Sequence, residues 1–182
     1  MKKRVVITGL GAITPIGKTA NETWNGIKNK ECGIDEIKLF NAENFKTKFD
    51  AEVKDFNSLD YLDMKQSKRL DRSSQFAIIA GREALKDSGI TTENTNFNNV
   101  GVFVSSGIGG LSTIQQQCEI NYEKGNNRVS PMFIPMGITN MPAGNVAIDL
   151  GLKGESISIV TACASSTHAI GEAFRNIQDG YE

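Results

Sequence analysis

The chain has 182 residues, 39% of them hydrophobic and 23% charged, which is typical of a soluble globular domain with one sizeable core. Its net charge of −1 argues against a general nucleic-acid or anionic-membrane binder. No apolar run is long enough to span a bilayer, and the N-terminus lacks the apolar segment of a signal peptide. Its three widely spaced cysteines predict neither a disulfide framework nor a zinc site, and a reducing cytoplasm fits them best.

The first third of the chain predicts a strand, a helix and a polar excursion. We expect residues 4–8 to form a strand and residues 21–29 a helix, with Trp24 and Ile27 as its apolar contacts. Residues 36–62 are mixed and polar with scattered phenylalanines, which indicates a surface excursion anchored by aromatic side chains.

The middle of the chain predicts two helices and a strand. Residues 71–88 form an amphipathic pattern that Asp71 can cap and Gly89 can end. Residues 100–105 predict a strand, and residues 111–124 a helix that is polar on most sides. Alternating strands and helices indicate an α/β sheet with helical cover.

A strand predicted over residues 156–160 runs into a helical pattern that begins at Cys163 and stops at Gly180. The unpaired N–H groups and the dipole at a helix start favour thiolate over thiol, and small neighbours leave room for a substrate. This position suits a nucleophile, but a free cysteine is more often a small buried hydrophobe. On position alone, both interpretations of Cys163 stay open.

Two glycine motifs have a weaker functional interpretation. Gly9 and Gly11 follow the first predicted strand, but Thr14 stands where a dinucleotide fingerprint needs a third glycine. Residues 107–110 could cradle a phosphate, but no Gly-Lys-Ser/Thr follows them. We therefore expect tight turns rather than nucleotide sites at both motifs.

Several segments, spread along the chain from residue 3 to residue 163, match one enzyme family. They are residues 3–11, 14–17, 101–110, 130–135 and 154–160, and the sequence Thr161-Ala162-Cys163, which matches an active-site cysteine motif. In these segments the chain resembles the β-ketoacyl-[acyl-carrier-protein] synthases, most closely the type II enzymes of bacterial fatty acid elongation. The resemblance implies a thiolase-like α/β fold, layered α-β-α-β-α in the intact enzyme. Residues 1–182 would be its N-terminal β-ketoacyl synthase domain, ending before the sheet of that domain is complete.

The resemblance also implies a decarboxylative Claisen condensation without a cofactor or a metal. Cys163 would take an acyl group from acyl carrier protein as a thioester, and its own N–H would supply half of an oxyanion hole. The carbanion left when malonyl-carrier protein loses CO₂ would then attack that thioester.

The family's two histidines and its lysine lie far downstream of the cysteine, so we expect residues 1–182 alone to be inactive. The sequence holds one histidine, His168, five positions after Cys163. Five positions turn a helix by about 140° beyond a full circle, so the two side chains do not share a face. We expect His168 to pack or cap on the helix rather than to act as the base.

The resemblance places Gly107, Ile108 and Ala162 along the acyl pocket. It also implies a homodimer in which Phe133 of the partner subunit closes part of that pocket.

Lys65, Lys68 and Arg69 have the spacing of one helix face, which by default is a solvated face. Carrier proteins are strongly acidic, and a local basic face can steer one. The resemblance places carrier docking at these three residues and at Arg128.

Two other functions stay open on the sequence. The chain could be a non-catalytic truncated product or partner subunit of a condensing-enzyme dimer, although a scaffold has no need of a thiol at this turn. It could also be a thiolase-type enzyme that uses acyl-coenzyme A, and the downstream base residues would distinguish the two.

Overall fold

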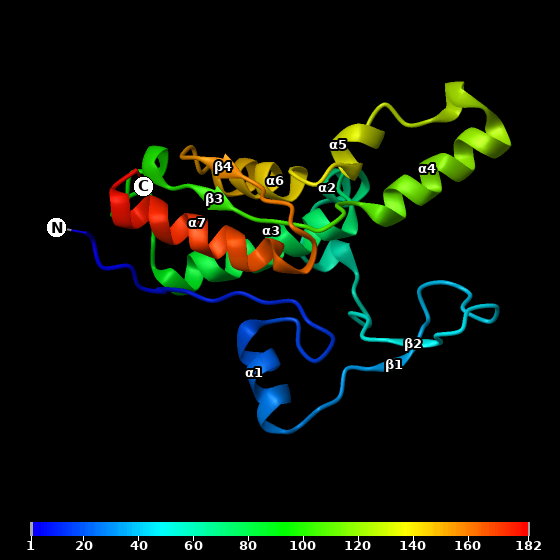
Figure 1. Ribbon diagram of the computed structural model, residues 1–182, viewed down its shortest axis with the longest axis horizontal. Helices are drawn as coiled ribbons and strands as arrows, with labels where there is room; N and C mark the ends of the chain where they lie inside the picture. Colours follow the sequence, from blue (N-terminus) through cyan, green and yellow to red (C-terminus); the bar gives the residue numbers. More distant parts are fainter. Residues whose placement is uncertain (1, 182) are drawn as a thin grey trace.

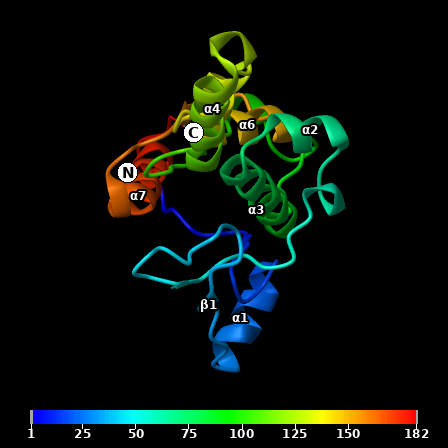
Figure 2. The same ribbon diagram turned by 90° about the vertical axis from the view of Figure 1, so that its right-hand side faces the viewer.

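The computed structural model describes residues 2–181. A short parallel strand pair lies between helices, with β3 and β4 joined in the register Val102↔Ser156 and Phe103↔Ile157. Helix α6 contacts both strands and α3, and α7 contacts β3 (Figure 1, Figure 2). The elements are α1 (Ala20–Lys28), β1 (Asp35–Glu36), β2 (Phe49–Asp50), η1 (Ser58–Asp60), α2 (Met64–Arg69), α3 (Arg72–Ser88), η2 (Phe97–Asn99), β3 (Val102–Phe103), α4 (Leu111–Lys124), η3 (Asn126–Arg128), α5 (Phe133–Gly137), α6 (Met141–Leu150), β4 (Ser156–Ile157), η4 (Ala162–Ala164) and α7 (Ser165–Asp179).

Helix α3 forms as its sequence predicts. The Asp71 carboxylate accepts the N–H of Ser73 at the N-terminus, and Gly89 ends the helix in the left-handed conformation, with φ of 67°. Ile78 and Ile79 are buried in the core, which packs α3 and α6 against β3. The buried apolar residues of this core are Leu62, Ile78, Ile79, Val102, Ala143 and Val146.

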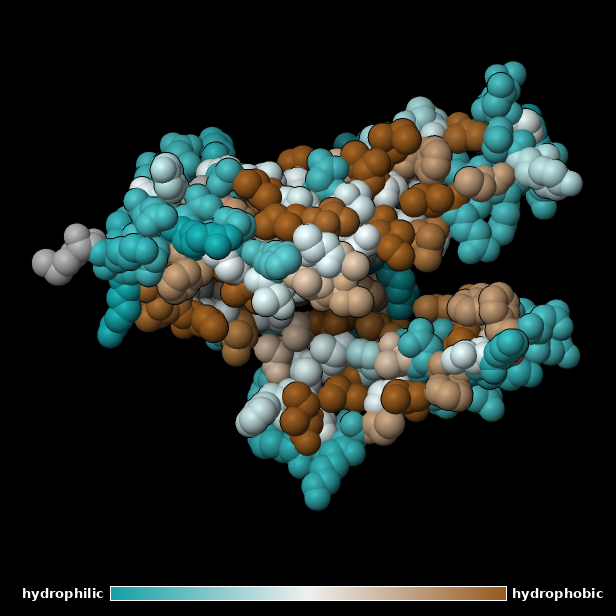
Figure 3. All heavy atoms as spheres, viewed as in Figure 1, coloured by the Kyte–Doolittle hydropathy of each residue, from teal (hydrophilic) through white to brown (hydrophobic). Residues whose placement is uncertain are grey.

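The strand expected at residues 4–8 is wrong. Among residues 2–181 this segment pairs with no strand, and its Val6 and Ile7 are exposed. Figure 3 shows that hydrophobic residues lie on the surface of the molecule at many places. The chain instead runs along α3, where the Glu83 carboxylate accepts the N–H groups of Ala12 and Ala20, each at 2.9 Å. These bonds fasten Ala12 and Ala20 to α3, whereas neither of them reaches residues 4–8.

Helix α1 forms where expected, but its contacts are not those predicted. Trp24 and Ile27 are 57% and 54% exposed, so the expectation that they pack inward is wrong. The buried residue is Gly26, where an added methyl would lie 3.2 Å from the Ile16 side chain. The helix is held by a close backbone approach, which a search for large apolar side chains overlooks.

The excursion between α1 and η1 is an arm that carries the β1–β2 hairpin. The ammonium of Lys54 lies 2.8 Å from the Asp35 carboxylate, and this hydrogen bond lowers the pKa of Asp35 to about 2. At the base of the arm, Phe56 packs edge-on against Phe76, as expected of an aromatic anchor.

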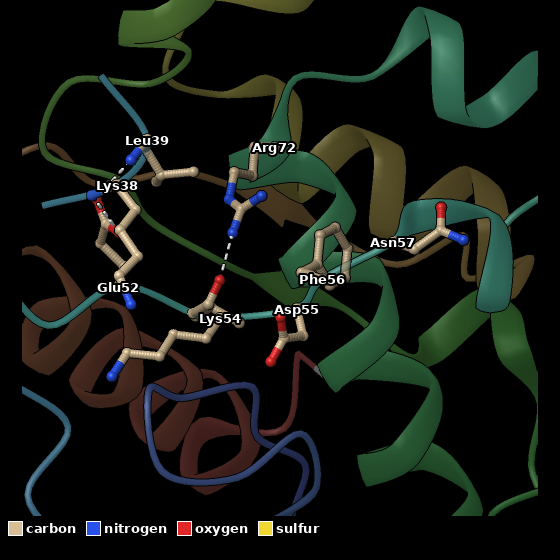
Figure 4. Close-up of a pocket in the computed structure, with 9 residues that line it drawn as sticks. Lys38, Leu39, Glu52, Lys54, Asp55, Phe56, Asn57 and Arg72 are labelled. Carbon is tan, nitrogen blue, oxygen red and sulfur yellow. Dashed lines mark hydrogen bonds between the residues drawn. The ribbon is translucent and has the colours of Figure 1, made fainter. Parts of the chain in front are cut away.

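A cavity of about 520 Å³ opens between this arm and α3, and Figure 4 shows its lining. The Arg72 guanidinium stacks over Phe56 and Phe76 and donates to the carbonyl of Val53 at 2.8 Å. Burial lowers the pKa of Arg72. The Glu52 carboxylate accepts the backbone N–H groups of Lys38 and Leu39, which closes the arm on itself, whereas the bond from Arg72 to Val53 ties the arm to α3.

The remaining elements differ from expectation mainly in length. The strands expected at 100–105 and 156–160 are each two residues long, the helix at 111–124 is confirmed, and α5 and α6 were not predicted. Among residues 2–181, no helix has the length and apolar character needed to cross a membrane. The same residues bring no three potential metal-binding side chains together.

Candidate active site

Cys163 lies in η4, the single turn that joins the β4 segment to α7. The strand–turn–helix geometry expected from the sequence is therefore present, although α7 itself begins two residues later, at Ser165. The Cys163 side chain is exposed. Across the described part of the chain it has no hydrogen-bond or ionic partner. A thiol that is accessible and unpartnered is open to a substrate, which favours the nucleophile over the buried hydrophobe.

The residue before the cysteine has an unusual backbone. Ala162 has φ of 51°, one of three non-glycine residues among residues 2–181 with a positive φ. This conformation costs a residue with a Cβ about 1–2 kcal/mol, and such strain is typical of a nucleophile turn. The sequence gives no sign of this conformation, because alanine is not a residue that favours it.

His168 does not pack in the core, contrary to one expectation, since its side chain is exposed. Its Nδ1 lies 2.8 Å from the hydroxyl oxygen of Thr161, two residues before the cysteine. No hydrogen bond joins His168 to Cys163 within residues 2–181. The ring therefore braces the turn from the side, and its placement favours a supporting position over that of a base.

The loop after β3 lies against the cysteine turn. A methyl group on Gly107 would lie 3.6 Å from the carbonyl oxygen of Ala162, so these two predicted pocket residues are neighbours. Ile108 is 59% exposed beside them.

On its other side this loop packs against the end of α5, the helix that Phe133 begins. A methyl on Gly110 would lie 2.6 Å from the carbonyl oxygen of Met136. The structure thus brings Gly107 and Ala162 together, with Phe133 half-buried one helix away.

Three of the four predicted docking residues share one surface. Lys65, Lys68 and Arg69 are exposed on α2, as the spacing predicts. Arg128 lies in η3, past the outer end of α4, and both ribbon views place it apart from α2 (Figure 1, Figure 2). The part of Arg128 in carrier docking stays a prediction.

The inner side of α2 is held by polar side chains. The amide of Gln66 donates to the Asp149 carboxylate at 2.9 Å, and the buried amide of Gln75 donates to the carbonyls of Ser67 and Leu70. A six-residue helix is marginal by itself, so these bonds fix where the basic side chains lie.

Sequence reasoning missed Ser165 as a site residue. Its side chain is 3% exposed and its Oγ bonds two backbone groups of the cysteine turn. The sequence shows a serine two positions after the cysteine, which is notable there only as one of the small residues beside Cys163.

Comparison with known proteins agrees with this geometry. Residues 2–182 match the family model described as the N-terminal domain of β-ketoacyl synthase. The chain is 46% identical over 180 residues to 3-oxoacyl-[acyl-carrier-protein] synthase 2 of Synechocystis sp.. It is 44% identical over 178 residues to the enzyme of the same name from Staphylococcus aureus strain N315. These alignments cover 99% and 98% of this chain but 43% of each relative, so the chain spans less than half their length.

Two solved structures resemble the fold. A β-ketoacyl synthase from Burkholderia phymatum superimposes with a TM-score of 0.84 at 27% identity, covering 100% of this chain and 45% of that one. A type II polyketide ketosynthase in complex with its acyl-carrier protein superimposes with a TM-score of 0.83 at 23% identity, covering 99% and 48%. With the family model matched over residues 2–182, the chain belongs to the β-ketoacyl synthase family and has its thiolase-like fold.

Proposed function

We propose that the chain supplies the acyl-accepting cysteine of a 3-oxoacyl-[acyl-carrier-protein] synthase, with Cys163 as the nucleophile. The observation that carries this proposal is the exposed Cys163 thiol on a strained turn between β4 and α7. The relatives named as 3-oxoacyl-[acyl-carrier-protein] synthases support the substrate class.

In the first half-reaction, the Cys163 thiolate attacks the carbonyl carbon of an acyl thioester on the carrier. The new C–S bond forms while the C=O electron pair moves onto oxygen, and the N–H of Cys163 lies on the turn where it could donate to that oxygen. Collapse of this intermediate re-forms the C=O bond and breaks the bond to the carrier sulfur. That sulfur leaves as a thiolate and takes up a proton, which balances the proton that Cys163 lost when it ionised. Residues 2–181 supply the nucleophile and one oxyanion donor to this step.

In the second half-reaction, malonyl-carrier protein loses CO₂ and its α-carbon attacks the Cys163 thioester. The bond to Cys163 breaks, the cysteine returns as thiolate, and the carrier keeps a 3-ketoacyl chain two carbons longer. The homodimer closed by Phe133 and the cytoplasmic location stay predictions.

The first test is acyl-enzyme formation in the protein as its gene encodes it. Incubation with octanoyl-carrier protein should add one octanoyl mass to the wild type, and Cys163→Ala should lose the adduct by a factor of roughly 1,000 or more. Cys118→Ala is the matched control, because Cys118 is also an exposed thiol. An adduct that persists in Cys163→Ala would exclude Cys163 as the nucleophile.

The second test concerns carrier docking, for which we propose the basic face of α2. Exchanging Lys65 and Lys68 for glutamate should raise the KM for acyl-carrier protein about tenfold with kcat nearly unchanged, since these charges guide encounter rather than chemistry. The effect should shrink in 0.5 M salt. Exchanging Lys46 and Lys48 on the arm for glutamate is the control, because it makes the same change in net charge. An equal rise in KM for both variants would show a nonspecific charge effect and remove α2 from the docking surface.

A further inference from the structure

We propose that Ser165 is a positioning residue that aims the backbone N–H of Cys163 at the substrate's carbonyl oxygen. This inference rests on the proposed function and assigns to a buried hydroxyl the task of orienting the oxyanion donor. Four observations carry it: the burial of Ser165, its two hydrogen bonds, the geometry of the peptide unit they hold, and the strain at Ala162.

The Ser165 hydroxyl is fully used on the cysteine turn. Its oxygen accepts the N–H of Thr161 at 2.9 Å, and its proton is donated to the carbonyl of Ala162 at 2.7 Å. A hydroxyl has one proton to give, so the two bonds fix the direction of each partner without ambiguity. At 3% exposure, water has little access to replace either bond.

The bond to Ala162 sets the direction of the neighbouring N–H. The carbonyl of Ala162 and the N–H of Cys163 belong to one planar peptide unit, and no peptide bond among residues 2–181 is cis. In a trans unit these two groups point in opposite directions. Since Ser165 draws the carbonyl inward, the N–H of Cys163 must point away from α7. That N–H has no acceptor among the described residues, so it is available to an oxyanion.

The same bonds hold a conformation that would otherwise relax. Ala162 is strained at φ of 51°, and its carbonyl also accepts the backbone N–H of Ser165. Thr161 is braced by its bond to Ser165 and by the contact of its hydroxyl with His168 at 2.8 Å. Loss of the Ser165 hydroxyl would leave the Ala162 carbonyl held by the backbone N–H of Ser165 alone and the N–H of Thr161 without its acceptor, which loosens the peptide unit between Ala162 and Cys163.

Ser165 does not serve as an ordinary helix cap. A serine at a helix start usually accepts a backbone N–H two or three residues onward, but here the N-cap residue of α7 is Ala164 and no side chain caps it. The hydroxyl points back into the turn instead of forward along the helix. A serine that served only to stabilise α7 would instead accept a backbone N–H from further along the helix.

The test compares two reactions of the same thiol in the protein as its gene encodes it. Transfer of an octanoyl group from its carrier passes through an oxyanion, whereas alkylation by iodoacetamide does not. Ser165→Ala should slow single-turnover acyl transfer about ten- to hundredfold, since an oxyanion donor is misdirected. Alkylation of Cys163 should change less than about threefold, because only the thiolate is involved.

The matched control is Ser166→Ala, the same change one position along, at an exposed serine without a side-chain hydrogen bond among the described residues. It should leave both reactions at wild-type rates. Ser165→Thr keeps the hydroxyl and adds no second thiol, so its acyl transfer should stay within about threefold of wild type. A fall as large as that of Ser165→Ala would show that the hydroxyl is not what matters.

An equal fall in both reactions would show that Ser165 is merely structural, and wild-type acyl transfer in Ser165→Ala would overturn the inference outright. Both results differ from failure of the proposed function, in which wild-type Cys163 would take no acyl group at all.

Discussion

Replacing Gly11 with alanine is expected to destabilise the protein by about 3 kcal/mol or more. A methyl group at Gly11 would lie 2.8 Å from the backbone nitrogen of Ala84 and would overlap the carbonyl oxygen of Ala80. Both atoms belong to the backbone of α3 and cannot turn away as a side chain could. The N-terminal segment would have to leave the helix, and the bonds from Ala12 and Ala20 to Glu83 would be strained or lost with it.

The measurement is the free energy of unfolding in urea for wild type, Gly11→Ala and Gly171→Ala. Gly171 is inside α7 with nothing within 4 Å of its added methyl, so this control should gain about 0.5–1 kcal/mol from helix propensity. The same substitution thus has opposite expected signs at two sites. If Gly11→Ala remained within 1 kcal/mol of wild type, the close packing on α3 would be wrong.

This contact also explains the Gly9-Leu10-Gly11 motif. The sequence indicates that the backbone at these positions needs glycine. It does not show whether glycine is needed for a turn, for a bound phosphate or for a helix that packs closely. The neighbour is α3, since a methyl on Gly9 would lie 2.6 Å from the nitrogen of Ser88. What fills the space opposite a glycine is a tertiary fact that no local pattern encodes.

A helix could be predicted from the sequence where typical capping residues lie at its ends. Helix α3 has Asp71 and Gly89 at its ends, and α4 matches its predicted bounds. Helices α5 and α6 were missed because Pro135 and Pro142 lie in them, and proline in a pattern argues against a helix. At α6 the proline is in the first turn, where its missing N–H has no cost.

The strands were harder to predict. An alternating pattern indicates that one face of a strand is buried, but it does not show which segment pairs with that strand. Residues 4–8 have the composition of a strand but pair with no strand among residues 2–181, and it is the glycines after them, Gly9 and Gly11, that lie against α3.

At the candidate site, Cys163 and its turn could be predicted because the hydrophobic period changes there from that of a strand to that of a helix. The left-handed Ala162 and the bonds of Ser165 did not, because they depend on backbone directions that the residue types do not favour.

Replacing Asp149 with alanine is expected to cost about 2–3 kcal/mol. Its carboxylate, 7% exposed, receives two parallel bonds from Arg82, from Nε at 2.7 Å and from Nη2 at 2.6 Å, and a third from Gln66. These bonds raise the pKa of Arg82. A guanidinium stays protonated at neutral pH with or without a partner, so removal of Asp149 leaves a charge behind. Breaking a buried pair costs about 3–5 kcal/mol, and the 39% exposure of Arg82 lowers this figure because water can solvate the freed guanidinium.

The effect should reach the docking surface as well. Arg82 also donates to the carbonyl of Tyr61 and Gln66 ties α2 to Asp149, so the loss of one carboxylate loosens both ends of the segment that carries the basic residues. Asp149→Ala should therefore raise the KM for acyl-carrier protein as well as lower the urea midpoint.

The control is Glu172→Ala, which removes an exposed ion pair with Arg175 on α7 and should change neither the urea midpoint nor the KM. If Asp149→Ala lowered stability with an unchanged KM, the network would hold the fold without setting the position of α2. Gln75 also holds α2, through the carbonyls of Ser67 and Leu70. A six-residue helix is nevertheless marginal by itself, so we expect both the urea midpoint and the KM to change.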